Sequence, residues 1–162
     1  MADALEAGAR AAAVEMEAPL TLTRRAAPDA SVEDVLAADG FLFAAPENLA
    51  SVSGAMKEFF DRSYYHMFDA SGSGAEYAET SRLVGRPFGL AIAAGSDGTS
   101  AARQVERICR GWRLQPVGDT LVEKNGQPQR AALILAPKPA CPPDVRARCH
   151  ELGGLVAATL LL

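Results

Sequence analysis

The chain has 162 residues, of which 49% are hydrophobic and 22% charged, and its formal net charge at pH 7 is -4. This length and composition suit one globular domain over residues 1–162 and exclude a disordered chain. The acidic balance argues against a nucleic-acid partner, and no apolar run reaches the roughly 18 residues of a membrane span. Acidic residues also stand where a signal peptide would be basic, so we expect a cytoplasmic protein.

The opening segment predicts a helix, because apolar residues recur on one face from Leu5 to Met16 and Pro19 ends the pattern. The residues from Leu20 to Thr23 then predict a short strand. A brief helix should follow, capped by Asp29 or Ser31.

The run from Gly40 to Ala45 is apolar without alternation and stops at Pro46. This pattern predicts a strand that is buried on both faces, as in a parallel sheet. A helix follows it, with Ser51 or Ser53 as its cap. Residues 67–83 show no clear period and predict a long surface loop.

A second buried strand runs from Phe88 to Ala94, and a helix with one apolar face follows it. Residues 115–122 predict a third, weaker strand. The stretch from Ala131 to Leu135 fits a strand or a buried turn, because prolines crowd it. The last helix starts near Pro143. Strands and helices thus alternate, which predicts an α/β domain with a parallel sheet and helices on both faces.

The cysteines and histidines offer no metal-binding pattern. Cys109, Cys141 and Cys149 are odd in number and form no CxxC pair, which favours buried reduced thiols. His66 and His150 are far apart in sequence and have no partner motif. We therefore expect no metal site.

Two loops follow the predicted buried strands: residues 46–54, with the sequence PENLASVSG, and residues 94–100, with the sequence AGSDGTS. Ligands of open α/β sheets bind outside the carboxyl ends of the strands. Both loops also precede helix N-termini, whose unpaired N–H groups suit an electron-rich ligand edge. Capping of the two helices would require the same residue types. A ligand site and plain capping therefore both stay open.

Two stretches carry a family resemblance: ADGFLFAAPENLASVSGAMKEFFDR, residues 38–62, and GRPFGLAIAAGSDGTSAARQVERICRGWRL, residues 85–114. They resemble, in order and spacing, the third and fourth strands with the following loops and helices of flavodoxin-like, NAD(P)H-dependent FMN reductases. The resemblance implies that FMN is the cofactor. It also implies that the polar edge of the flavin ring contacts nine residues: Pro46, Glu47, Asn48, Leu49, Ser51, Gly95, Ser96, Asp97 and Gly98.

The chain departs from that family at its start. Family members begin with a buried strand and a Ser/Thr/Gly-rich turn that holds the FMN phosphate, whereas Met1 stands about where the first helix begins. We therefore expect a three-layer flavodoxin-like sheet without its first strand, an interior member in the strand order 2-1-3-4-5. Three explanations are open: the strand is encoded upstream, which we favour, the segment from Leu20 to Thr23 shifts inward, or a partner chain fills the gap.

The resemblance implies an NAD(P)H oxidoreductase that passes electrons from the nicotinamide through FMN to a small-molecule acceptor. We name no catalytic acid or base, because the cofactor performs the difficult step. One alternative is a flavodoxin-like electron carrier, although neither loop offers an aromatic residue to stack on the ring. Another is a truncated, non-catalytic protein of the same fold. Since such reductases often place the ring near a subunit interface, we also expect a homodimer, with residues 67–83 as its contact.

Overall fold

The computed structural model describes residues 1–69, 80–124 and 141–162. The stretch from Ala131 to Leu135 and most of the loop expected at residues 67–83 lie outside these ranges. None of the described helices is long and apolar enough to cross a membrane.

The sheet is built around two neighbouring parallel strands, β1 (Phe41–Asn48) and β3 (Pro87–Ala94). The short strands β4 (Gln115–Pro116) and β5 (Leu121–Lys124) also pair with β3 in parallel. The two-residue strand β2 (Ser51–Val52) pairs with β1 in the antiparallel direction. The predicted parallel sheet is confirmed, and its two long strands are the two continuous apolar runs.

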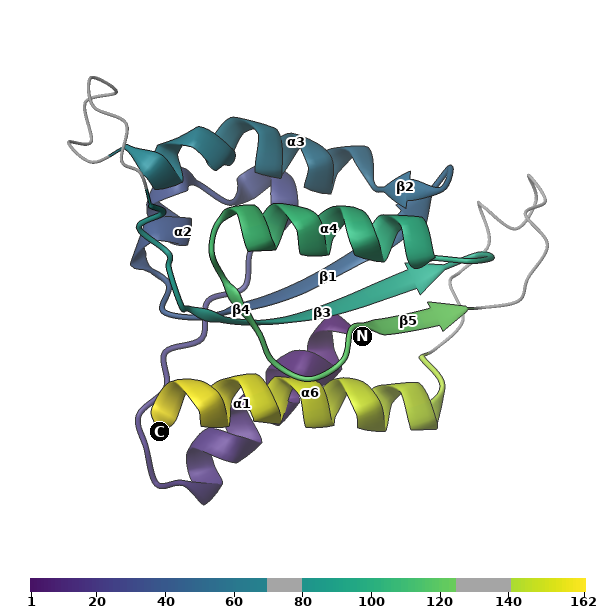
Figure 1. The fold of residues 1–162 in the computed structure, drawn as a ribbon. Coiled ribbons are helices and arrows are strands. Elements are labelled where there is room, and N and C mark those ends of the chain that lie inside the picture. The colour runs from purple at the N-terminus through teal and green to yellow at the C-terminus, as the bar shows by residue number, and fades with distance from the viewer. Residues whose placement is uncertain (70–79, 125–140) are drawn as a thin grey trace.

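Helices cover both faces of this sheet, as predicted (Figure 1). One layer holds α2 (Val32–Ala37), α3 (Gly54–Ser63) and α4 (Thr99–Gly111), with the short 3-10 helices η1 (Ala27–Asp29) and η2 (Tyr64–Phe68). The other layer holds α1 (Ala2–Glu15) and α6 (Pro143–Leu161). The result is a three-layer α/β architecture.

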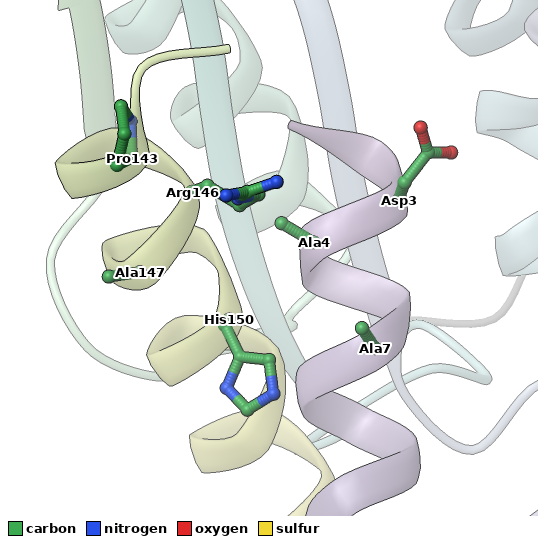
Figure 2. Close-up of a pocket in the computed structure, with 7 residues that line it drawn as sticks. All are labelled: Asp3, Ala4, Ala7, Pro143, Arg146, Ala147 and His150. Carbon is green, nitrogen blue, oxygen red and sulfur yellow. The ribbon is translucent and has the colours of Figure 1, made fainter.

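Helices α1 and α6 lie side by side (Figure 2), and small residues allow their backbones to approach closely. A methyl group added at Gly8 would lie 1.8 Å from the carbonyl oxygen of His150, and one added at Gly153 would lie 1.9 Å from that of Leu5. Any side chain at these two positions would force the helix backbones apart. The two glycines therefore set the distance between the helices of this layer.

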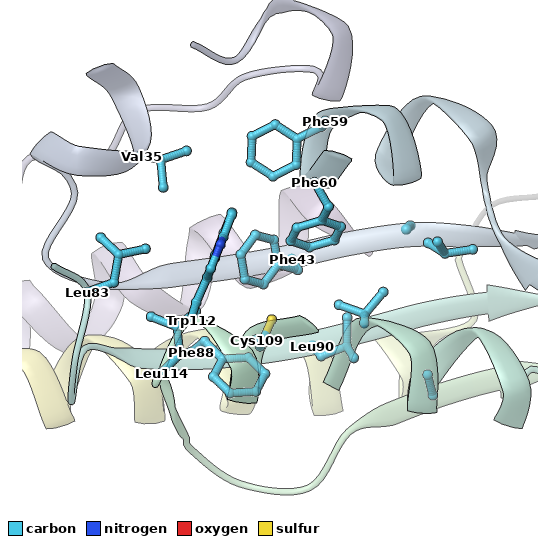
Figure 3. Close-up of a cluster of buried hydrophobic side chains, with 14 of the residues drawn as sticks. Val35, Phe43, Phe59, Phe60, Leu83, Phe88, Leu90, Cys109, Trp112 and Leu114 are labelled. Carbon is cyan, nitrogen blue, oxygen red and sulfur yellow. The ribbon is translucent and has the colours of Figure 1, made fainter. Parts of the chain in front are cut away.

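Two apolar clusters hold the layers together, one on each face of the sheet. The cluster under α3 and α4 is aromatic (Figure 3). At its centre Trp112 is fully buried, with its ring centroid 5.3 Å from that of Phe60. The cluster under α1 and α6 is aliphatic and includes Leu5, Leu152 and Val156. Successive residues of β1 serve opposite clusters, as a strand buried on both faces requires.

Three predictions about strands are wrong. The residues from Leu20 to Thr23 form no strand; instead the guanidinium of Arg24 bonds to the carboxylate of Asp3 and ties this segment to α1. Strand β1 continues past Pro46, whose carbonyl oxygen accepts a hydrogen bond from the N–H of Ser53 at 3.1 Å. Proline has no N–H to donate, but its carbonyl oxygen can still accept this bond. The third strand is split into β4 and β5.

Candidate functional site

The two predicted loops lie next to each other. Strands β1 and β3 run in parallel with Pro46 opposite Ala93, so both loops leave the same edge of the sheet. A direct contact joins them: the backbone N–H of Gly98 donates a hydrogen bond to Oε1 of Glu47 at 3.0 Å. The structure therefore brings residues 46–51 and 95–98 together at the edge where open α/β sheets bind ligands.

The first loop is a tight β-hairpin rather than an irregular turn. Asn48 pairs with Ser51 across a two-residue turn, and the turn residues Leu49 and Ala50 have φ of 52° and 59°. Positive φ at both central residues is typical of a type I′ turn, which suits the twist of a hairpin. Leu49, at the tip of the hairpin, is 93% exposed.

A residue outside both loops holds this hairpin in place. Oε1 of Gln104, on α4, accepts hydrogen bonds from Oγ of Ser51 at 2.8 Å and from the N–H of Val52 at 3.0 Å. Sequence reasoning missed Gln104, because nothing local distinguishes it from other polar residues beside the apolar stripe of α4. Only the packing of α4 against the hairpin reveals its role.

The second loop is shaped by local bonds and by close packing. The carboxylate of Asp97 accepts hydrogen bonds from the hydroxyl and the backbone N–H of Thr99, at 2.9 and 3.1 Å. These bonds hold the pKa of Asp97 below its usual value, and the bond from the hydroxyl has the larger effect. Gly98 has a φ of +73°, and a methyl group there would lie 2.4 Å from Cγ1 of Val122. Packing therefore requires glycine at position 98.

Helix capping explains some of the polar residues in the two loops. Ser53 caps α3 by accepting a hydrogen bond from the N–H of Met56 at 3.4 Å, and Asp97 closes the turn before α4. Among the nine residues predicted to contact the flavin ring, Asn48 and Ser96 have exposed polar side chains to which no other described residue bonds. They lie on the two adjoining loops and are free to meet a ligand.

A cleft lies in another part of the molecule. It has a volume of about 520 Å³ and runs between α1 and α6, where Arg146 extends from α6 toward α1 beside Ala4 (Figure 2). None of the nine residues predicted to contact the flavin ring lines it. The helix pair and the two-loop edge are therefore separate features.

The described residues contain no cluster of three or more His, Cys, Asp or Glu side chains that could hold a metal ion. The three cysteines are unpaired. Cys109 and Cys149 are buried, and burial raises the pKa of both thiols. Raised pKa values keep these thiols protonated and unreactive at neutral pH.

Comparison with protein families gives one match: the model of the family described as NADPH-dependent FMN reductase matches residues 5–127. That range includes both loops and Gln104. Comparison with curated proteins gives no match.

Solved structures share the fold at low sequence identity. An oxidoreductase from Corynebacterium diphtheriae has a TM-score of 0.64 and 17% identity, over 99% of this chain and 86% of that one. A WrbA-like flavodoxin protein from Agrobacterium tumefaciens has a TM-score of 0.59 and 15% identity, over 96% and 88%. The Flv1 flavodiiron core from Synechocystis has a TM-score of 0.58 and 17% identity, over 95% of this chain and only 31% of that one. These similarities establish a flavodoxin-like fold.

Proposed function

The chain belongs to the NADPH-dependent FMN reductase family, a family of flavin-binding oxidoreductases, and we propose that it oxidises NAD(P)H through bound FMN and reduces a small acceptor. The acceptor would be a free flavin, a quinone or a metal complex. The hydrogen bond between Glu47 and Gly98 is the observation that supports this proposal most. It unites the two loops in which the resemblance placed the flavin ring edge.

The residues at this edge fit the ring of FMN. Asn48 and Ser96 offer exposed amide and hydroxyl groups that can bond to the polar atoms of a flavin. Gly95 places no side chain between the second loop and a flat ring, whereas Gly98 is packed against Val122 and Ala94. Bound FMN would supply the hydride acceptance and the onward electron transfer.

The described residues offer less to the phosphate of FMN. An anion is best held at a helix N-terminus, but the first turn of α1 carries the acidic side chain of Asp3. The carboxylate of Asp3 is already bonded to Arg24. In our proposal, the nine loop residues therefore bind the ring, and the phosphate is not assigned to α1.

The protein would orient the ring and exclude side reactions rather than supply an acid or a base. Glu47 and Gln104 would keep the two loops together, so that the ring edge meets a preformed surface. The exposed side chain of Leu49 would lie at the rim of this surface. The expected homodimer and the cytoplasmic location stay proposals beside this one.

The test is a titration of the protein with FMN, read by quenching of flavin fluorescence, followed by assays of NADH and NADPH oxidation with a quinone, free flavin or ferric chelate as acceptor. We expect saturable binding and acceptor-dependent oxidation. Binding without oxidation under any acceptor would overturn the reductase proposal and favour the electron carrier, for which the absence of aromatic residues in both loops is unfavourable. Absence of binding would overturn both and favour a non-catalytic protein.

A further inference from the structure

The side chain of Gln104 links α4 to the hairpin of residues 47–52. Its Oε1 accepts two hydrogen bonds at once, from the hydroxyl of Ser51 and from the backbone N–H of Val52. A backbone N–H can only donate, so the amide atom that faces Val52 must be the oxygen. The chemistry therefore fixes the orientation of the Gln104 amide.

Val52 needs this partner because of its position in the hairpin. The N–H of Ser53 bonds back to Pro46, and Asn48 pairs with Ser51 next to the turn. Hydrogen-bonded and non-bonded pairs alternate in antiparallel strands, so the intervening pair of Glu47 and Val52 points its N–H groups away from the ladder. Val52 is only 2% exposed, which leaves water little access to its N–H. Gln104 satisfies a donor that the hairpin itself cannot.

A second contact ties the other strand of the hairpin to the same part of the fold. Glu47 accepts its hydrogen bond from Gly98, immediately before α4, whereas Val52 donates to Gln104 within α4. Both strands of the hairpin are thus bonded to α4 or to Gly98, the residue that immediately precedes it. The turn residues Leu49 and Ala50 lie between the two fastened positions.

We propose that Gln104 is a positioning residue for the flavin site: it holds Ser51 and Val52 so that the hairpin and the 95–98 loop keep a fixed separation before the ligand arrives. This proposal rests on the proposed function. It extends that function to a residue on α4 that lies outside both loops. Because the link exists without a ligand, its presence can be tested separately from flavin binding.

The first experiment measures amide hydrogen exchange at Val52 by NMR without FMN. Loss of one hydrogen bond should speed this exchange about tenfold in Gln104→Leu, because leucine offers no acceptor. Gln104→Glu should keep the protection, because a carboxylate still accepts from both donors. The matched control is Arg107→Leu, which places the same new side chain at an exposed position of α4. Unchanged protection of Val52 in Gln104→Leu would overturn the proposal.

The second experiment measures FMN affinity, with thermal unfolding recorded for each variant. We expect Gln104→Leu to weaken FMN binding about tenfold, and Gln104→Glu and Arg107→Leu to bind within twofold of the parent protein. Faster exchange at Val52 with unchanged FMN affinity would show a link that does not position the site, and would overturn the proposal. If Gln104→Leu does not fold, Gln104→Asn replaces it, because its shorter side chain cannot reach Val52. A parent protein that binds no FMN would refute the proposed function, while the exchange measurement would still report on the link.

Discussion

Glu47 and Gly98 lie 51 residues apart in the chain, and the carboxylate of the first accepts a hydrogen bond from the backbone N–H of the second at 3.0 Å. Glu47 stands near the end of β1 and Gly98 at the N-terminus of α4. The contact joins the two connections that leave the carboxyl edge of the sheet. The positions of the two loops therefore depend on each other, and a change in either loop is expected to affect the other.

Removing the Glu47 carboxylate should loosen this edge of the sheet. We expect Glu47→Ala to lower the free energy of unfolding by about 1–2 kcal/mol, because the N–H of Gly98 loses its partner. Glu47→Gln should cost less, because its amide oxygen still accepts. Urea denaturation at pH 7 measures both, with Glu58→Ala, which removes an exposed ion pair with Arg62, as the control. Equal losses in the Ala and Gln variants would contradict the assigned role.

Gly98 should not tolerate a side chain. Its φ is +73°, and an added methyl group would lie 2.4 Å from Val122 and 2.8 Å from Cβ of Ala94. We expect Gly98→Ala to destabilise the protein by about 1–3 kcal/mol through strain and overpacking. Gly54→Ala is the matched control, because nothing lies within 4 Å of the methyl group it adds. A thermal unfolding midpoint of Gly98→Ala as high as that of the control would refute the packing argument.

Adjacent glycines in α6 should respond in opposite ways. A methyl group at Gly153 would meet the carbonyl oxygen of Leu5 at 1.9 Å, whereas one at Gly154 would find its nearest neighbour at 3.5 Å. We expect Gly153→Ala to cost about 3 kcal/mol, since α1 must move away, and Gly154→Ala to be neutral or stabilising by up to about 1 kcal/mol. Chemical denaturation of the two variants decides this. Similar stabilities would mean that α1 and α6 do not pack as closely as described.

The start of α2 should make stability depend on pH in the acidic range. The side chains of Ser31 and Asp34 bond to each other's backbone N–H groups at 3.1 and 3.0 Å, and the bond from the N–H of Ser31, with help from Arg25, lowers the pKa of Asp34. A carboxyl group with a lowered pKa in the folded state stabilises the protein above its unfolded pKa, and this contribution is lost as the pH falls through the folded value.

We therefore expect Asp34→Asn to be less stable than the parent protein at pH 7 and the difference to shrink below about pH 4. Thermal unfolding midpoints of both proteins from pH 3 to pH 7 measure this. Asp39→Asn serves as the control, because Asp39 takes part in no hydrogen bond or ion pair among the described residues. A difference that stays constant across this range would rule out the carboxylate as its cause.

The local pattern of the sequence determined the elements at the centre of this fold. The apolar runs that became β1 and β3 are continuous because helices cover both faces of each strand. Residues that point to either face must therefore be apolar. Capping is equally local: Ser31 and Ser53 lie within three residues of the N–H groups that they bind. The order of the elements also placed both loops at the carboxyl edge of a parallel sheet.

Only the tertiary structure decided how these elements meet. The residues from Leu20 to Thr23 have a strand-like composition, but a strand forms only where a neighbour offers hydrogen bonds, and the segment is instead tied to α1 through Arg24. Gln104 acquires its role from Ser51 and Val52, more than 50 residues away, which no local pattern encodes. The sequence by itself thus determined which segments are buried and which precede helices. The contacts that join those segments depend on side chains brought together from distant positions, and so only the folded chain reveals them.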